Sequence, residues 1–600
     1  MSTKPFNLVK YLFFIFISYL YILVYCDKGE IKMAYFVKKT PQYDRVYLQI
    51  INGVYDPKTK NVKQKVYQKL GYLDELEKDY KDPIAYYKAW CQTKNAQEKL
   101  IDLEPIPTKN ELFNLGYFPF KRLYKELSVK RIVNNFQALI EDNGRYHLSD
   151  VFESLLYARI LNPSSKSSTY EHFLSSLYHS FPYSKSQMYD AIELLGQDNG
   201  SIFEGIQLMI SEKYKRNMSN VYFDASNFYF EIDQPNELAK LGPSKENRKN
   251  PIIGLGLLLD GDAIPLDYKL YPGNESEKPV YRDILKDLKV KNNIQSKVIR
   301  IADKGLNSGD NIAHAYLDKD GYIFSQSIRG AKADLKSRIL DPKDYIEVRD
   351  NEGQLVYKSK SWIDYEAVIT VTTNEGKKVK VNIPQKQIVF WSRDYAEKAA
   401  IKRERALQKL EKQLKQESLY KKDLYGHVGK YIDESYLDES GDEADVLKIK
   451  SINQAKIDLD ESLDGYYLIV TSELKAKDEE IINAYKTLWQ IEESFRIIKS
   501  TLKTRPVYHS NLNAIRGHFL ICMTSLLFLR LIEKKKLKGQ VCATQLVSSL
   551  KKYTCGRIGD DKYQLFYHDE NINVLSQYYS VKLNQHYKTK SEIKQIFNEK

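Results

Sequence analysis

The sequence predicts a multidomain α/β protein in which a mixed β-sheet forms the centre of the largest folded part. Three observations lead to this prediction. The chain has 600 residues, more than one hydrophobic core usually supports. From Val221 onwards, segments rich in β-branched and aromatic residues alternate with helical segments in the order β, β, β, α, β, α, β. A helical region precedes them, and a second β-rich stretch interrupts the pattern between residues 331 and 458.

The first 32 residues differ in character from the rest of the chain. Tyr11 to Cys26 is an uncharged apolar run behind Lys4 and Lys10, which resembles a signal peptide or a short membrane span. Two alternatives are open: the run is a leader or an anchor, or translation starts at Met33 and residues 1–32 are absent from the native protein. We prefer the start at Met33, because ordinary globular sequence begins there and no A-x-A-like cleavage site follows the run.

Residues 33–105 are expected to form a small β-rich element, and residues 106–218 a helical domain that binds DNA. Alternating residues such as Val46 and Leu48 predict strands in the first, followed by a charged helix around residues 66–78. In the second, three segments carry apolar residues at helical spacing: LSVKRIVNNFQALIED, LSDVFESLLYARIL and SKSQMYDAIELLGQD. The last is either a recognition helix for a DNA groove or a core helix with a polar outer face.

Residues 219–330 and 459–535 are expected to form one folded core, interrupted by a β-rich domain inserted at residues 331–458. The first part contains the strands NVYFDASNFYFE, PIIGLGLLLD, AIPLDYKLYPG, KVIRIADKG and GYIFSQSIRG, with a helix at about 279–290. The insertion holds short strands and a long Lys/Glu-rich helix. The strand DGYYLIVTS then returns to the core, and residues 536–600 are expected to form a C-terminal helical region.

Charge and cysteine content restrict the class of protein. Lys and Arg number 92 and Asp and Glu 79, a net charge of +13, which favours a polyanionic partner but also fits solvated charged faces. The five cysteines lack metal-ligand spacing, which argues against structural zinc or a disulfide framework and favours a reducing, cytoplasmic location. The apolar tract at 518–532 is short for a membrane span and contains Arg530, so we expect a buried helix.

Two aspartates follow apolar strands. Asp224 stands after Val221–Phe223, and Asp303 stands after Val298–Ala302. Both carboxylates are therefore expected where buried strands emerge, at the edge where open α/β sheets bind their ligands. A lone Asp at a strand end is more often a turn former or a helix cap. The paired placement of the two favours a site.

A third acid, Glu492, lies on a predicted helix from Ala484 to Pro506, where proline prevents continuation. A core stripe recurs at three- and four-residue steps and consists of Leu488, Ile491, Phe495, Ile498 and Leu502. A second stripe, about 100° round the helix, consists of Tyr485, Glu492, Arg496, Lys499 and Lys503. Glu492 is thus expected at the shoulder of the buried face, half sheltered. The alternative is a solvated face with Glu492 and Arg496 as an i,i+4 ion pair.

These residues resemble the DDE transposases of bacterial insertion sequences, in the group that inserts a β-rich domain into an RNase H-like core. That group carries a Tyr, Arg, Glu, Lys signature, and the frame here is Tyr485, Leu488, Glu492 and Lys499 within YKTLWQIEESFRIIKSTLKTRPVYH. Leu488 replaces the Arg, as in one subgroup; either a DNA phosphate contact is lost or Arg496 supplies it. The resemblance covers Met33 to about residue 535 and includes the segments YFDAS, RKNPIIGLGLLLD, PGN, ADKGLNS and DGYYLIVTS.

The resemblance implies an RNase H-like mixed-sheet catalytic core interrupted by a β-rich insertion domain, with a mainly helical DNA-binding region at the N-terminal side. It implies that the catalytic residues Asp224, Asp303 and Glu492 bind two Mg²⁺ or Mn²⁺ ions, which prefer oxygen ligands and act together in phosphodiester cleavage. It also implies DNA phosphate contacts from Tyr485, Arg496, Lys499 and Arg505.

The expected function is that of an insertion-sequence transposase. Such an enzyme binds the terminal inverted repeats of double-stranded DNA as a homodimer, cleaves them and joins them to target DNA by a cut-and-paste route, in the cytoplasm and away from membranes. The alternatives are a metal-dependent nuclease of the same fold and a catalytically dead, transposase-derived DNA-binding protein. A membrane-anchored protein is a third, resting only on residues 11–26.

Three other side chains are expected to have structural rather than catalytic roles. Trp391 could stack on a displaced base, but we expect it to pack in the core. For His509 and His518 we expect hydrogen-bonding or capping roles rather than catalysis.

Overall fold

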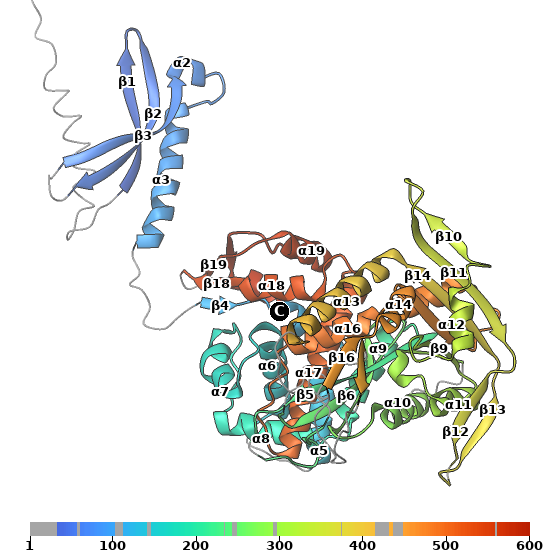
Figure 1. Cartoon of the computed structure of the whole chain (residues 1–600). Helices are drawn as coiled ribbons and strands as arrows, with labels where there is room; N and C mark the ends of the chain where they lie inside the picture. The colour runs from blue at the N-terminus through green and yellow to red at the C-terminus, as the bar shows by residue number, and fades with distance from the viewer. Residues whose placement is uncertain are drawn as a thin grey trace, which may run out of the picture. The chain divides into compact units, whose positions relative to one another are not determined.

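The computed structural model divides into two compact units, Met1–Glu111 and Leu112–Lys600, which are described separately (Figure 1). The expected leader, residues 1–32, lies outside the described residues. The structure describes residues 33–56, 61–102, 112–140, 146–232, 234–242, 249–291, 297–373, 375–414, 431–435, 448–558 and 561–599.

The first unit is a three-stranded antiparallel sheet with two helices. The strands β1 (Met33–Gln42), β2 (Arg45–Asp56) and β3 (Asn61–Tyr72) pair in chain order, and the helices are α2 (Leu73–Leu76) and α3 (Pro83–Asp102). Tyr35, Ile50 and Cys91 form the buried cluster between the sheet and α3.

The helix predicted around residues 66–78 is wrong, because β3 covers most of it. Val66 pairs with Ile51 of β2, and the ring of Tyr67 meets that of Tyr35 edge-on at 5.0 Å between centroids. The Lys and Gln residues in this segment favour a helix, but intrinsic helix propensity is small and the pairing with β2 overrides it.

In the second unit, helices form a layer rich in buried side chains. The members before the main sheet are α4 (Phe118–Glu126), α5 (Val129–Leu139), α6 (Leu148–Leu161), α7 (Lys166–Ser168), α8 (Lys185–Gly196) and α9 (Ser201–Lys213). The three helices predicted from apolar spacing are confirmed as α5, α6 and α8. Ser184 and Gln187 form a capping box at the start of α8, which satisfies backbone donors there.

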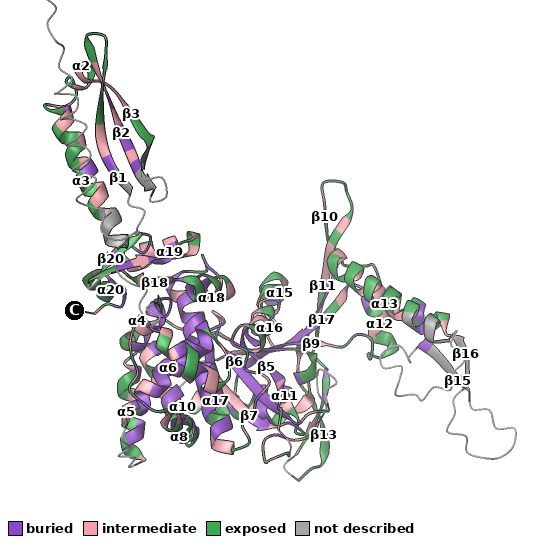
Figure 2. Cartoon of the chain, turned by 90° about the vertical axis from the view of Figure 1, so that its left-hand side faces the viewer, coloured by how far each residue is buried: buried purple, intermediate pink, exposed green. Residues whose placement is uncertain are grey.

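The centre of this layer is α17 (Leu512–Leu531), and the predicted burial of the tract at 518–532 is confirmed. It packs beside α6, and both are buried along most of their length (Figure 2). It approaches α8 at two glycines: a Cβ on Gly196 would lie 1.7 Å from the carbonyl oxygen of Asn513, and one on Gly517 would lie 2.0 Å from that of Ile192. By length and composition Leu512–Lys536 could cross a membrane, but 94% of its apolar window is buried within the protein.

One mixed sheet of nine strands runs through the second unit. Its inner strands appear in the predicted order of strands and helices: β5 (Asn220–Tyr229), β6 (Ile252–Leu259), β7 (Pro265–Pro272), α10 (Glu277–Lys291), β8 (Ile299–Ala302), α11 (Gly309–Leu317) and β9 (Gly321–Gln326). In space their order is β7-β6-β5-β8-β9. The pairs β5–β8 and β8–β9 are parallel, whereas β5–β6 and β6–β7 are antiparallel. The mixed α/β sheet expected from the sequence is confirmed.

The sheet continues beyond β9 through β17 (Tyr466–Thr471), β14 (Gln385–Ser392), β11 (Leu355–Asp364) and β10 (Ile346–Arg349). Three of these four strands come from residues 331–458, the predicted insertion, so that segment lengthens the core sheet. The rest of the segment contains α12 (Ala333–Leu340), β12 (Val368–Thr372), β13 (Lys378–Asn382), α13 (Arg393–Leu414), β15 (Ile432–Ser435), β16 (Lys448–Ile452) and α14 (Gln454–Ser462).

The C-terminal region contains strands besides the expected helices. Its elements are α18 (Ala543–Lys552), β18 (Thr554–Arg557), β19 (Lys562–Leu565), α19 (Glu570–Tyr579), β20 (Tyr587–Thr589) and α20 (Lys590–Ile596). The strand β18 pairs with β4 (Leu112–Asn114), more than 400 residues earlier, and the sheet order is β20-β19-β18-β4. Pairing over such a distance leaves no periodic signal in the local sequence.

We expect Phe519→Ala to lower the free energy of unfolding by about 3–5 kcal/mol, because it empties a buried aromatic site. Phe519 is fully buried, and its ring meets that of Phe228 on β5 edge-on at 5.5 Å between centroids. Urea-induced unfolding measures the loss. The control Leu208→Ala, whose side chain is 58% exposed, should change stability by no more than about 0.5 kcal/mol. Equal effects of the two substitutions would contradict this packing.

Candidate active site

Asp224 lies in the middle of β5, so its predicted place at the end of a strand is wrong. The strand continues to Tyr229, and Asp224 itself pairs with Leu257 of β6. The next five residues, Ala225 to Tyr229, also pair with β6. This pairing extends the strand beyond the apolar segment Val221–Phe223. Asp303 follows Ala302, the last residue of β8, and here the prediction is confirmed.

The register of the parallel pair indicates that the two aspartates lie at neighbouring positions. Asn220 pairs with Ile299 and Tyr222 with Ile301, and continuing this register by two residues places Asp224 opposite Asp303, which follows the end of β8. Neighbouring strands lie about 4.8 Å apart, and alternate residues share a face. Tyr222 and Ile301 belong to the same core cluster as Ile491 and Phe519. Both carboxylates therefore belong to the sheet face that the helix of Glu492 covers.

Two hydroxyl groups hold Asp303. Ser325 on β9 donates a hydrogen bond from Oγ to Oδ1 of Asp303 at 2.8 Å, and the phenol of Tyr485 donates to the same oxygen at 3.2 Å. Burial raises the pKa of Tyr485, and the charge of Asp303 raises it further, so the phenol keeps the proton that it donates. Among the described residues, Oδ2 of Asp303 has no hydrogen-bond partner.

The helix predicted from Ala484 to Pro506 is divided into three helical segments. These are α15 (Asp478–Lys486), α16 (Trp489–Arg496) and a π-helical turn (Ile497–Thr501). Between α15 and α16 the amides of Leu488, Gln490 and Ile491 each donate to the carbonyl three residues earlier, which tightens the chain as in a 3₁₀ turn. The predicted core stripe is confirmed in full, and every member is at most 8% exposed: Leu488, Ile491, Phe495, Ile498 and Leu502.

Glu492 is exposed on α16, which contacts β5, and the prediction of a half-sheltered carboxylate is wrong. Within the described part of the chain, this carboxylate has no hydrogen-bond or ion-pair partner. The i,i+4 pair with Arg496 is absent there too, because Arg496 pairs with Glu493 at 3.4 Å. Burial raises the pKa of Tyr467 on β17, and the charges of Asp303 and Glu492 both raise it further.

The structure thus brings Asp224 and Asp303 together and leaves Glu492 on the neighbouring helix. In the described ranges, no group of three His, Cys, Asp or Glu side chains is close enough to hold a metal ion. The donor chemistry fits a hard divalent cation, since all three are carboxylates. As described, the three side chains do not form a complete metal-binding group.

A buried arginine fixes the helix that carries Glu492. Arg530 on α17 is fully buried. Its guanidinium donates to Glu533 at 2.7 Å, to Glu493 at 3.3 Å and to the Ser494 hydroxyl at 3.0 Å. The contacts with Glu493 and Ser494 tie α16 to α17 directly beside Glu492.

Two cations of the motif lie along β5. Lys499 donates from Nζ to the Ser226 hydroxyl at 2.5 Å and lies 5.5 Å from the ring centre of Phe228. Arg505 lies 5.6 Å from the ring centre of Tyr229, and burial lowers its pKa. Ser226 is two residues after Asp224, on the same face of the strand. Sequence reasoning missed Ser226, Ser325 and Tyr467, because polar strand residues have no spacing that marks them.

The remaining candidates have structural contacts. Trp391 on β14 donates from Nε1 to the carbonyl oxygen of Asp464 at 2.9 Å, but its side chain is half-buried rather than in the core as predicted. The Nε2 of His518 lies 3.2 Å from the carbonyl oxygen of Thr504, as expected for a hydrogen-bonding role. Burial lowers the pKa of His509 to about 4, with Lys166 and Arg159 as further causes, and places that of His518 well below its ordinary value.

We expect the protein to lose stability as the pH falls from about 6.5 to about 4. The pKa of His509 is lower in the folded protein than in the unfolded chain, so its contribution is complete above pH 6.5 and is lost as protons bind to the unfolded state. His518 adds in the same direction. The thermal midpoint measured against pH should change less steeply in His509→Gln. An unchanged slope in that variant, equal to the slope of a control at the exposed His172, would contradict this assignment.

Residues 231–528 match the family model described as the transposase DDE domain; the range includes Asp303 and Glu492 and begins seven residues after Asp224. No curated protein matches the chain. Among solved structures it is similar to the piggyBac transposase in a cryo-EM synaptic complex with hairpin DNA, with 10% identity, a TM-score of 0.36, and coverage of 73% of this chain and 80% of that one. The similarity to the transposase DDE domain thus extends over slightly less than half of the chain.

Proposed function

We propose that this chain is the transposase of an insertion sequence, which cuts DNA at terminal inverted repeats and joins the ends to a target by a cut-and-paste route. The observation that carries the proposal is the parallel pairing of β5, which holds Asp224, with β8, which Asp303 directly follows, beside and within the segment that matches the transposase DDE domain. In this proposal Asp224, Asp303 and Glu492 are the catalytic acids.

The three acids would hold two divalent metal ions, Mg²⁺ or Mn²⁺. Such ions supply activation of the attacking oxygen and stabilisation of charge on the leaving oxygen. The hydrogen bonds from Ser325 and Tyr485 support this role for Asp303, because they orient the carboxylate through Oδ1 and leave Oδ2 available. Glu492 supports it by its exposure and lack of a partner among the described residues. In this proposal Glu492 joins the two aspartates when the site binds metal and DNA.

In this proposal Tyr485 has two successive tasks. Its phenol now contacts Asp303, so it acts first as a positioning residue for that carboxylate and contacts a DNA phosphate only when the site closes on DNA. Lys499 and Arg505 follow β5 away from Asp224, and Arg496 is exposed one turn beyond Glu492. These cations would guide a DNA backbone past the acids. We propose that two copies act together on two DNA ends and that residues 106–218 contribute to end binding.

We expect Asp224→Asn, Asp303→Asn and Glu492→Gln each to reduce excision of a marked DNA segment from a plasmid in cells by roughly 100-fold or more. Loss of a metal ligand removes several kcal/mol of transition-state stabilisation, and each 1.36 kcal/mol is a factor of ten. The control Glu479→Gln changes an exposed acid on α15 and should leave excision unchanged.

Three further outcomes separate the alternatives. Cleavage without joining of a pre-cleaved DNA end would identify a nuclease. Undiminished excision in all three acid variants would exclude the proposed site, and binding of DNA without any cleavage by the unaltered chain would identify a catalytically dead protein.

We expect Arg496→Gln to weaken binding of duplex DNA and to reduce the slope of log affinity against log salt by about one, as for the loss of one phosphate contact. Fluorescence anisotropy with an end-sequence duplex at several salt concentrations measures both. Lys475→Gln, at an exposed position outside the motif, is the control. If Arg496→Gln matches this control, Arg496 does not contact the backbone, and the replacement of the signature arginine by Leu488 has no compensation from Arg496.

A further inference from the structure

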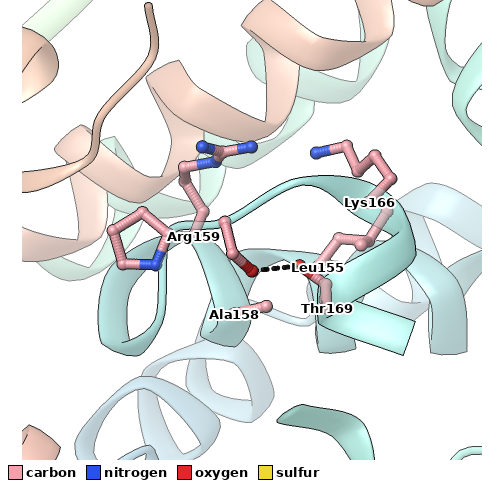
Figure 3. A pocket seen from close by; sticks show the side chains of 7 residues that line it. Leu155, Ala158, Arg159, Lys166 and Thr169 are labelled. Carbon is pink, nitrogen blue, oxygen red and sulfur yellow. Dashed lines mark hydrogen bonds between the residues drawn. The ribbon is translucent and has the colours of Figure 1, made fainter. Parts of the chain in front are cut away.

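A second cluster of cations surrounds a pocket in the helical layer (Figure 3). Arg159 comes from the last turn of α6 and Lys166 from α7. The pocket is a narrow hollow, partly open to solvent, and is lined by Leu155, Ala158, Arg159, Pro163, Ser164, Lys166 and Thr169. The charged ends of Arg159 and Lys166 point toward one another.

The charge of this pocket is not compensated. Lys166 is only 7% exposed, and its ammonium group has no hydrogen-bond or ion-pair partner among the described residues. Arg159 is 6% exposed; it donates from Nη1 to the carbonyl oxygens of Leu502 and Lys503 at 3.2 and 3.3 Å, while its buried Nε has no acceptor. Neutral carbonyls do not cancel a buried charge, which is costly to leave unpaired.

No carboxylate among the described residues contributes to the pKa of Lys166. Burial lowers the pKa of Lys166 to about 7, and the charge of Arg159 lowers it further. The nearby imidazoles of His509 and His518 are affected by the same two cations. Two buried cations without a counter-ion destabilise the free protein, and a bound ligand of opposite charge would offset this free-energy cost.

Hydrogen-bond donors complete the pocket. The hydroxyls of Ser164 and Thr169 lie 3.1 Å apart and bond to each other, so each can turn toward a ligand instead. The hydroxyl of Thr504, the residue after the Leu502 and Lys503 carbonyls that accept from Arg159, is buried without a partner among the described residues. Two cations with neighbouring hydroxyl donors match the several acceptor oxygens of a phosphate group.

We propose that Arg159 and Lys166 form a binding site for a phosphate group. The planar guanidinium offers directed donors and the ammonium a compact charge. The phosphate comes either from a DNA backbone or from a free phosphate or nucleotide. Because Arg159 holds the carbonyls of Leu502 and Lys503, between Lys499 and Arg505 of the motif, an occupied pocket also fixes the segment that carries those cations. This site is independent of the acids of the proposed active site.

Thermal unfolding of the full chain in inorganic phosphate, compared with chloride at equal ionic strength, tests the proposal. The unaltered chain should gain several degrees in its midpoint in phosphate, and Lys166→Met should lose at least half of that gain. The control Lys130→Met, at an exposed lysine paired with Asp150, should keep it. Without phosphate, Lys166→Met should be at least as stable as the unaltered chain at pH 6, because it removes an uncompensated buried charge.

Duplex DNA identifies the source of the phosphate. Weaker duplex binding by Lys166→Met than by Lys130→Met, with a salt slope lower by about one, assigns a backbone phosphate, whereas equal duplex binding together with a lost phosphate gain assigns a free phosphate or nucleotide. The proposal is overturned if phosphate gives the unaltered chain no gain over chloride, or if Lys166→Met keeps the full gain. If Lys166→Met is less stable than the unaltered chain but keeps the full rise of its thermal midpoint in phosphate, Lys166 has a structural role only.

Discussion

The structure of the candidate site depends on strand β5, which forms hydrogen bonds with a neighbouring strand at each edge and packs against a buried cluster on each face. It pairs in antiparallel fashion with β6 and in parallel with β8. One face packs on the cluster that contains Tyr281 and Ile284 of α10, and the other on the cluster that contains Ile491 and Phe519. Only the parallel partner brings a second strand end beside Asp224, so the juxtaposition of two acids is a consequence of sheet order.

The helix that carries Glu492 is positioned by a charge rather than by apolar packing alone. Arg530 lies within α17, which is mostly apolar and buried, and is itself fully buried. Its contacts with Glu493 and Ser494 fix the rotation of α16, since a guanidinium that lost these acceptors would remain buried and unpaired at a high cost. The same contact holds Glu493 inward, and Glu492 is then directed outward. Adjacent glutamates thereby acquire opposite roles.

Cations in the second unit fall into two groups with different physical settings. Lys499 and Arg505 contact hydroxyl and aromatic groups along β5, where cation–π contact stabilises them without neutralising their charge. Arg159 and Lys166 are more deeply buried and have no carboxylate partner in the part of the chain that the structure describes. The segment from Leu502 to Arg505 connects the two groups, because Arg159 binds its carbonyls.

The sequence by itself determined the features that repeat with a local period. The helices α5, α6 and α8, the strand order from β5 to β9 and the whole core stripe from Leu488 to Leu502 follow from apolar spacing, because burial of one face imposes that spacing. Tertiary structure decided the rest. Pairing with β6 extended β5 past Asp224, and pairing with β2 made a strand of residues predicted as a helix. The tight turn at Leu488 and the buried Arg530 exposed Glu492, and the contacts of Asp303 join residues from three separate elements, which no local pattern records.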